Sequence, residues 1–188
     1  RVASSALVVR ESLEECVKGS ESPIEWNTLA GFTVKHRYKM IDQVDEKYKD
    51  KNGVADTRKA NRQLTATNKW GTKSRKIRIA QYFDDQFDKE KMKRSVSPNF
   101  IHSLDASHMI LTINEMAKQG VQCFQMIHDA FGTHAENCDL MHETVRKTFV
   151  QLHEDDPFHR LLEKYGVEIP KKGDLDLDEI LKSEYIIH

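Results

Sequence analysis

Cysteine, long apolar runs and net charge are scarce or missing in this chain of 188 residues. The cysteines, Cys16, Cys123 and Cys138, are widely spaced and include no Cys-x-x-Cys pair. This argues against a disulfide framework or a zinc cage and favours ordinary thiols in a reducing compartment. No apolar run approaches the roughly 20 residues of a membrane helix, and the first ten residues lack the pattern of a secretory signal. We therefore expect a protein that does not enter a membrane.

The net charge of -1 hides an uneven distribution. Residues 35–94 hold 18 Lys and Arg against 9 Asp and Glu, so the remainder of the chain is acidic. Within residues 58–83 there are eight cations and no acid, interleaved with polar and aromatic residues. A solvated loop can have this composition, but so long a basic stretch without acids is typical of a segment that binds a polyanion. The distribution favours nucleic acid as a partner.

The periodicity of the chain predicts an α+β fold with a β-rich basic insertion. The hydrophobic fraction of 38% is sufficient for a core. Short alternating segments follow one another from Val34 to Tyr82 and predict strands. Apolar residues at helical spacing predict helices over Val2–Val17, Asn99–Gln119, Glu136–His153 and Pro157–Tyr165. Pro98 is expected to open the second of these helices and Gly120 to close it.

The candidate chemistry lies at His128 and Asp129. Two short apolar runs, Val121–Ile127 and Phe131–His134, predict strands joined by a tight turn that consists of His128, Asp129 and Ala130. A carboxylate at the tip of such a turn can bind Mg²⁺, which prefers oxygen ligands. Asp129 can instead close the turn by an Asx-type hydrogen bond. Both interpretations stay open at this point.

A second polar cluster lies on the preceding helix, where His102, Asp105 and His108 follow one another at intervals of three. Residues three apart lie near one another on a helix. The cluster is therefore compatible with a zinc site or a general base pair, but the commoner arrangement of such residues is a hydrogen-bonded polar patch that is buried.

Two strings resemble the C-terminal part of the single-subunit DNA-dependent RNA polymerases of bacteriophages and mitochondria. Residues 98–109, PNFIHSLDASHM, resemble the helix that runs beneath the active site of that family, and residues 128–135, HDAFGTHA, resemble its motif C. Ala130 replaces the serine that is common in that motif. The Lys171–Leu177 stretch and the final Tyr185–His188 resemble the lysine-glycine segment and the C-terminal foot of the family.

The resemblance implies three regions: 1–34, a helix and entry strand of a fingers/palm fragment; 35–97, a basic insertion like the specificity hairpin; and 98–188, the palm with motif C and the foot. It implies helices packed around a small antiparallel palm hairpin. It also implies templated nucleotidyl transfer with two Mg²⁺ ions, for which Asp129 is one of two aspartate ligands. His128 would lie beside the primer terminus, and His102 would approach the RNA–DNA hybrid.

The implied partners are the DNA template and promoter, the RNA product, ribonucleoside triphosphates and the upstream part of the polymerase. Arg75, Lys76 and Arg78 are candidate phosphate contacts. The implied location is the cytoplasm of a bacterial host for a phage enzyme and the mitochondrion for an organellar one.

No string resembles the family's other catalytic aspartate or its nucleotide-binding helix, and the chain starts without an initiator Met. We therefore expect a fragment that is inactive alone. Two other hypotheses remain: a stand-alone DNA-binding module without catalysis, and a metal-dependent hydrolase. The hydrolase would use His102, Asp105, His108, His128 and Asp129.

Overall fold

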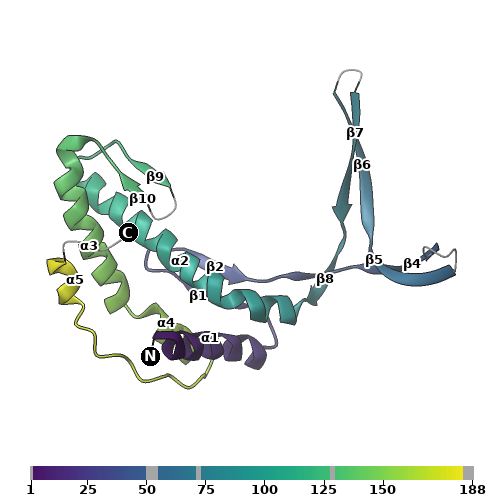
Figure 1. The fold of residues 1–188 in the computed structure, drawn as a ribbon, viewed down its shortest axis with the longest axis horizontal. Helices are drawn as coiled ribbons and strands as arrows, with labels where there is room; N and C mark the ends of the chain where they lie inside the picture. Colours follow the sequence, from purple (N-terminus) through teal and green to yellow (C-terminus); the bar gives the residue numbers. More distant parts are fainter. Residues whose placement is uncertain (1, 50–54, 71–72, 128–129, 184–188) are drawn as a thin grey trace. The chain divides into compact units, whose positions relative to one another are not determined.

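The computed structural model describes residues 2–49, 55–70, 73–127 and 130–183. The chain forms two compact units, namely residues 1–36 with 90–188, here called the globular unit, and residues 37–89, here called the insertion (Figure 1). The sequence places the end of the insertion at residue 97. The structure differs because residues 90–97 are the first turns of a long helix that belongs to the globular unit.

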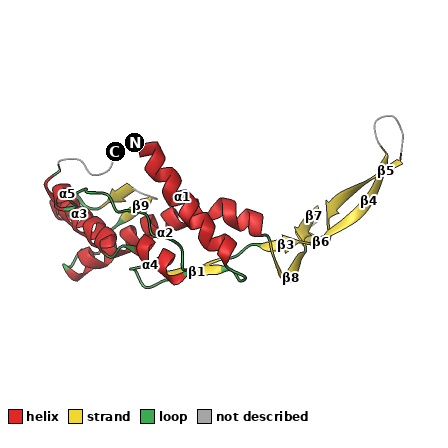
Figure 2. Cartoon of the chain, turned by 90° about the horizontal axis from the view of Figure 1, so that it is seen from below, coloured by secondary structure: helices red, strands yellow, loops and turns green. Residues whose placement is uncertain are grey.

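Helices and small antiparallel sheets together make the predicted α+β fold (Figure 2). The described helices are α1 (Val2–Gly19), α2 (Lys89–Lys118), α3 (Cys138–Glu154), α4 (Pro157–Lys164) and α5 (Asp178–Lys182), with a 3-10 turn at Ala135–Asn137 before α3. None of the described helices has the length and apolar character needed to cross a bilayer.

Helix α2 corrects one prediction, because it begins at Lys89 and contains Pro98 in its interior. Proline lacks an amide hydrogen and removes one bond of the helix, which costs about 3 kcal/mol. Met92, Val96 and Phe100 follow one another at intervals of four and are at most 2% exposed. Burial of such side chains contributes about 1.5–3 kcal/mol each, which outweighs the lost bond. The buried face of α2 therefore continues on both sides of Pro98, and the helix is not interrupted there.

The core of the globular unit lies where α2 packs against α1, α3 and the first strand pair. Strands β1 (Ile24–Asn27) and β2 (Thr33–His36) pair antiparallel, with Trp26 opposite Val34. Further along α2, the buried hydroxyls of Thr112 and Thr148 lie 2.8 Å apart and link α2 to α3. Each hydroxyl also lies 2.9 Å from a carbonyl oxygen of its own helix, that of His108 for Thr112 and that of Thr144 for Thr148. One hydroxyl can therefore donate to its carbonyl and accept from the other, so both buried hydroxyls have a partner.

The insertion consists of three antiparallel strand pairs and is branched. A stem is formed by β3 (Lys39–Ile41) and β8 (Tyr82–Phe87), a first hairpin by β4 (Gln43–Lys49) and β5 (Ala55–Asn61), and a second hairpin by β6 (Gln63–Trp70) and β7 (Lys73–Ala80). The three pairs meet at a ring of backbone hydrogen bonds. The amide of Arg62 donates to Asp42, that of Asp42 to Gln81, and that of Gln81 to Arg62, at 2.8–2.9 Å.

Candidate active-site hairpin

The hairpin of β9 (Gln125–Ile127) and β10 (Ala130–Gly132) confirms the predicted pair of strands. Ile127 pairs with Ala130 and Phe131 with Met126, so His128 and Asp129 form the two-residue link of the sequence between paired strand ends. His128 and Asp129 themselves lie outside the described residues. Ala130 belongs to the strand instead of the turn, because it takes part in the pairing.

At the open end of the hairpin a side-chain hydrogen bond joins the two segments, and the two strands approach each other closely at a glycine. The Thr133 hydroxyl donates to the Cys123 carbonyl at 2.9 Å. Gly132 lies opposite Gln125, where a Cβ at Gly132 would be only 3.1 Å from the Gln125 carbonyl oxygen. The only indication of this close approach in the sequence is that a glycine follows Phe131 within the predicted strand.

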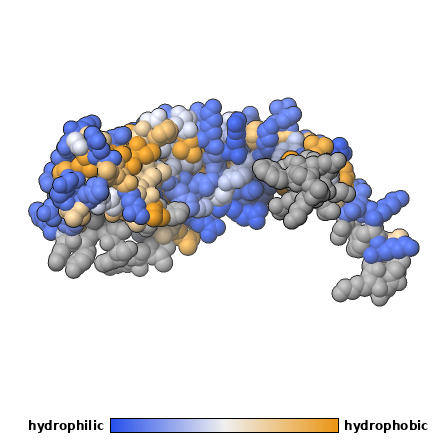
Figure 3. Space-filling view, turned by 90° about the horizontal axis from the view of Figure 1, so that it is seen from above, coloured by the Kyte–Doolittle hydropathy of each residue, from blue (hydrophilic) through white to orange (hydrophobic). Residues whose placement is uncertain are grey.

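One face of the hairpin packs on the core and the other is exposed. Met126 and Phe131 pack against a buried cluster made of Met116, Val121, Met141 and Val145. On the opposite face Ile127 is 57% exposed and Ala130 is exposed as well. Figure 3 shows hydrophobic residues gathered at the end of the globular unit that carries this hairpin. The chain on both sides of the His128–Asp129 link therefore reaches the surface.

His108 packs against the core-facing side of the hairpin. The residue is 6% exposed, and its ring centroid lies 5.2 Å from that of Phe131 and 5.4 Å from that of Phe149. Its Nε2 lies 2.8 Å from the Val145 carbonyl oxygen, and because a carbonyl only accepts, Nε2 carries the proton. Burial lowers the pKa of His108, so the ring is neutral at physiological pH.

The cluster of His102, Asp105 and His108 is divided between two faces of α2. His102 and Asp105 are exposed, whereas His108 is buried and bonded to α3. Within the residues that the structure describes, no group of three or more His, Cys, Asp or Glu side chains could hold a metal ion. Of the alternatives that the spacing allows, the zinc site is therefore excluded for these three residues, and the buried polar patch holds for His108 but not for His102 and Asp105. The physical reason is that α3 covers only the face of α2 that carries His108.

Arg75, Lys76 and Arg78, here called the β7 cations, lie on the second hairpin of the insertion. Their backbone positions face Asn68, Thr67 and Thr65 of β6, and their side chains lie outside the described residues. The first hairpin mixes its cations with Asp45, Glu46, Asp50 and Asp56, whereas residues 63–80 contain five cations and no acid. The branching thus places five of the eight cations of the acid-free stretch on an arm of their own, whereas Arg58 and Lys59 lie on β5 of the first hairpin.

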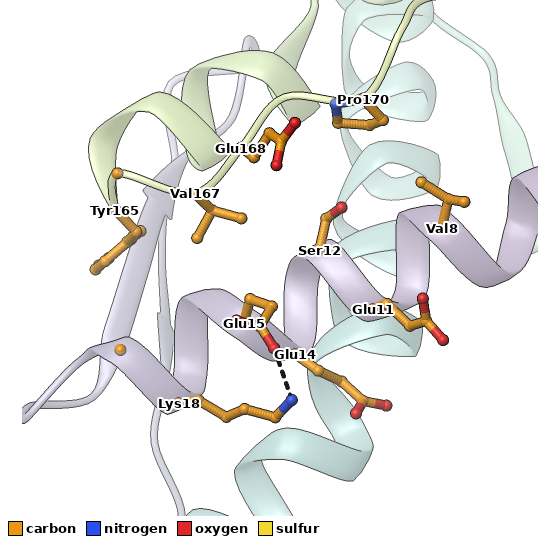
Figure 4. A pocket seen from close by; sticks show the side chains of 12 residues that line it. Val8, Glu11, Ser12, Glu14, Glu15, Lys18, Tyr165, Val167, Glu168 and Pro170 are labelled. Carbon is orange, nitrogen blue, oxygen red and sulfur yellow. Dashed lines mark hydrogen bonds and ion pairs between the residues drawn. The ribbon is translucent and has the colours of Figure 1, made fainter.

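A groove of about 820 Å³ lies between α1 and the segment that follows α4 (Figure 4). Its lining includes Glu11, Glu14, Glu15 and Glu168. The guanidinium of Arg10, which bonds Glu14 at 2.8 Å, holds the pKa of that carboxyl below its usual range, so it is ionised at neutral pH. The lining also contains one cation, Lys18, which is paired with Glu15. The groove therefore has an excess of carboxylates, which disfavours a nucleic-acid backbone because like charges repel.

Comparison with known proteins agrees with the resemblance. A family profile described as DNA-dependent RNA polymerase matches residues 2–168. The chain is 29% identical over 187 residues to "DNA-directed RNA polymerase 2B, chloroplastic/mitochondrial" of Nicotiana tabacum, which covers 94% of this chain and 16% of that protein. It is 36% identical over 116 residues to "DNA-directed RNA polymerase 2, chloroplastic/mitochondrial" of Arabidopsis thaliana, covering 57% of this chain and 11% of that protein.

A third relative, "DNA-directed RNA polymerase 1A" of Nicotiana tabacum, is 29% identical over 174 residues, which are 88% of this chain and 96% of that sequence. The chain spans about one sixth of the length of the tobacco 2B relative. Since the profile match extends over most of the residues and includes both strings on which the resemblance rests, the chain belongs to the DNA-dependent RNA polymerase family, in its single-subunit phage and organellar type.

Proposed function

We propose that this chain is the C-terminal part of a DNA-directed RNA polymerase and contributes to templated, Mg²⁺-dependent nucleotidyl transfer. The observation that carries the proposal is the family match over residues 2–168, which includes the string of residues 128–135 that resembles motif C; this string starts at the link between β9 and β10 and continues through β10. The hairpin is held on one face by the core and is exposed on the other. Such a support can present a carboxylate toward substrates without exposing the core.

Asp129 is the proposed metal ligand, and His128 the proposed neighbour of the primer terminus. Bound Mg²⁺ would supply the charge that lowers the pKa of the RNA 3'-hydroxyl and neutralises the triphosphate. A carboxylate fits such a hard cation. The resemblance implies two aspartate ligands, so Asp129 would be one of them and the other would come from elsewhere in the polymerase; the 188 residues alone would then not catalyse the reaction.

The exposed His102 on α2 is the proposed contact to the RNA–DNA hybrid. The β7 cations are the proposed phosphate contacts to promoter DNA, because they lie on the arm without acids. DNA, RNA and ribonucleoside triphosphates are then the partners. The tobacco 2B and Arabidopsis relatives are named as chloroplast and mitochondrial polymerases, which favours an organelle as the location.

A DNA-binding module without catalysis is the second candidate function. It is favoured by the acid-free arm of residues 63–80, whose composition suits a polyanion. It predicts DNA binding with a steep salt dependence and without a requirement for Mg²⁺. The metal-dependent hydrolase is not proposed, because His102 and Asp105 are on a different face of α2 from His108.

Asp129→Asn tests the proposal in the complete polymerase. The substitution keeps the shape of the side chain and removes its charge, so nucleotide addition to a preformed primer–template hybrid should fall by a factor of roughly 10³ or more, the size expected when a charge that stabilises the transition state is lost. Asp174→Asn removes the same charge from an exposed residue outside the hairpin and serves as the matched control.

Normal nucleotide addition by Asp129→Asn would refute the catalytic assignment. If the wild-type protein binds DNA but adds no nucleotide at any Mg²⁺ concentration, the module without catalysis is the better description.

A further inference from the structure

The junction between the two units contains a side chain that neither the sequence nor the proposed chemistry singled out. The chain leaves the globular unit after His36, the last residue of β2, and returns at Glu90 in the first turn of α2. His36 is 2% exposed although it is polar and is followed directly by the insertion. A histidine so deeply buried at this place requires an explanation.

Both ring nitrogens of His36 bind α2. Nε2 lies 2.8 Å from the Met92 carbonyl oxygen, and Nδ1 lies 3.2 Å from the side-chain amide nitrogen of Asn99. The carbonyl accepts, so Nε2 donates; the amide nitrogen donates, so Nδ1 accepts. The two partners are seven residues apart, or about two helical turns. One ring therefore ties the end of the outgoing strand to two successive turns of the returning helix.

The two hydrogen bonds require a neutral His36 ring, and the buried surroundings of His36 favour this neutral form. Burial lowers the pKa of His36, although the bond to the Met92 carbonyl opposes this shift. The ring of Trp26 lies 5.9 Å away, measured between centroids, and its Nε1 donates to the Ser103 hydroxyl of α2 at 2.9 Å. Strands β1 and β2 are thus both bonded to the same helix by buried side chains.

On the other side of the junction the insertion is closed by its own backbone. The Asp88 amide donates to the Tyr38 carbonyl at 2.9 Å, and Lys39 pairs with Phe87 in the stem. The outgoing and returning segments are therefore tied twice, once by main-chain bonds within the insertion and once by His36 within the globular unit. A residue that only filled space in the core would need neither directional bond.

We propose that His36 anchors the root of the insertion, by fixing the end of β2 to α2 at Met92 and Asn99, and that it acts in promoter recognition as a positioning residue and not in nucleotide addition. The second half of this inference rests on the proposed function, in which the insertion contacts promoter DNA. Binding to one DNA sequence depends on the placement of the contacting groups, and loss of a single contact weakens it by about 1–3 kcal/mol.

The test compares His36→Phe with His36→Gln and with His153→Phe in the complete polymerase. Phenylalanine keeps the ring and removes both bonds, whereas glutamine retains an amide that can donate to the Met92 carbonyl. His153 is a matched control because its Nδ1 also lies close to a backbone carbonyl, that of Phe149 at 2.9 Å, but inside α3 and away from the junction.

The first readout is amide hydrogen exchange, which does not depend on activity. In His36→Phe the amides of β2 and of the first turns of α2 should exchange roughly tenfold faster, the size expected for one or two lost neutral hydrogen bonds. His36→Gln should recover part of this protection, and His153→Phe should leave the same amides unchanged. Unchanged exchange in His36→Phe would overturn the anchor.

The second readout is the ratio of RNA made from a promoter to RNA made by extension of a preformed hybrid. In His36→Phe this ratio should fall roughly tenfold, while extension stays near the wild-type rate. Faster exchange with an unchanged ratio would overturn the role in promoter recognition and leave the anchor standing. If the wild-type protein makes no RNA, the proposed function fails, and the exchange experiment still decides the anchor.

Discussion

Replacing Gly132 by alanine should distort the hairpin that carries the proposed metal ligand. A Cβ at Gly132 would lie 3.1 Å from the Gln125 carbonyl oxygen and 3.4 Å from the Gln125 Cβ. Non-bonded atoms are in best contact at roughly 3.5–4.0 Å, so β9 and β10 would have to separate by several tenths of an ångström. The Gln125 oxygen belongs to the main chain of a paired strand and cannot rotate away.

The size of the effect follows from two opposing contributions. Overpacking of this kind costs about 1–3 kcal/mol. Alanine also restricts the unfolded chain, which returns about 0.4–1 kcal/mol. The free energy of unfolding should therefore fall by about 1 kcal/mol. Because a displacement of about 1 Å of reacting groups can cost a hundredfold in rate, a shift of a few tenths should slow nucleotide addition by roughly threefold to tenfold.

The assay measures nucleotide addition to a preformed hybrid together with denaturant unfolding, in the complete polymerase. Gly19→Ala is the matched control, because a Cβ there would meet no atom within 4 Å. This control should be neutral or slightly stabilising. If the two alanine variants were equal in both stability and rate, the steric argument for Gly132 would be refuted.

The remaining predictions concern charge, pH and thiol chemistry. Reversing the charge of the β7 cations should weaken promoter binding and lower the slope of log affinity against log salt by roughly one for each lost phosphate contact, and an unchanged slope would remove β7 from the DNA interface. Burial lowers the pKa of His36 and His108 from 6.5, so below that pH the unfolded chain binds protons that the folded chain does not. Stability should then fall on acidification by up to roughly 1.4 kcal/mol per pH unit for each histidine, and denaturation at pH 7.5 and 5.5 with His→Gln variants measures this loss. Burial raises the pKa of Cys16 to about 11, so alkylation of the native protein should label the exposed Cys123 and Cys138 and spare Cys16; rapid labelling of all three would contradict its burial.

Local patterns accounted for most of the secondary structure. The helical spacing of apolar residues predicted α1, α3 and α4 to within about two residues, because each is specified by its own amphipathic face and its own end signals. The start of α2 was misjudged, since Pro98 is a local signal and the burial of Met92 and Val96 that overrides it depends on the rest of the core.

The branching of the insertion also could not be predicted from local sequence patterns. Alternation predicted strands between Val34 and Tyr82, but the meeting of three strand pairs depends on backbone bonds among Asp42, Arg62 and Gln81, the nearest of which are about 20 residues apart and the farthest about 40. Backbone hydrogen bonds carry no side-chain signature, so the sequence did not separate the acid-free arm from the mixed one.

The sequence by itself determined the family, the candidate metal ligand Asp129 and the basic character of the insertion, because these depend on the identity and order of residues. Only the tertiary structure decided how the polar residues are used. Helical spacing places His102, Asp105 and His108 near one another, but the packing of α3 on α2 buries His108 and leaves the other two exposed. His36 carried no signal in the sequence and became a candidate anchor through Met92 and Asn99, because side chains more than 50 residues apart meet only when the core has formed.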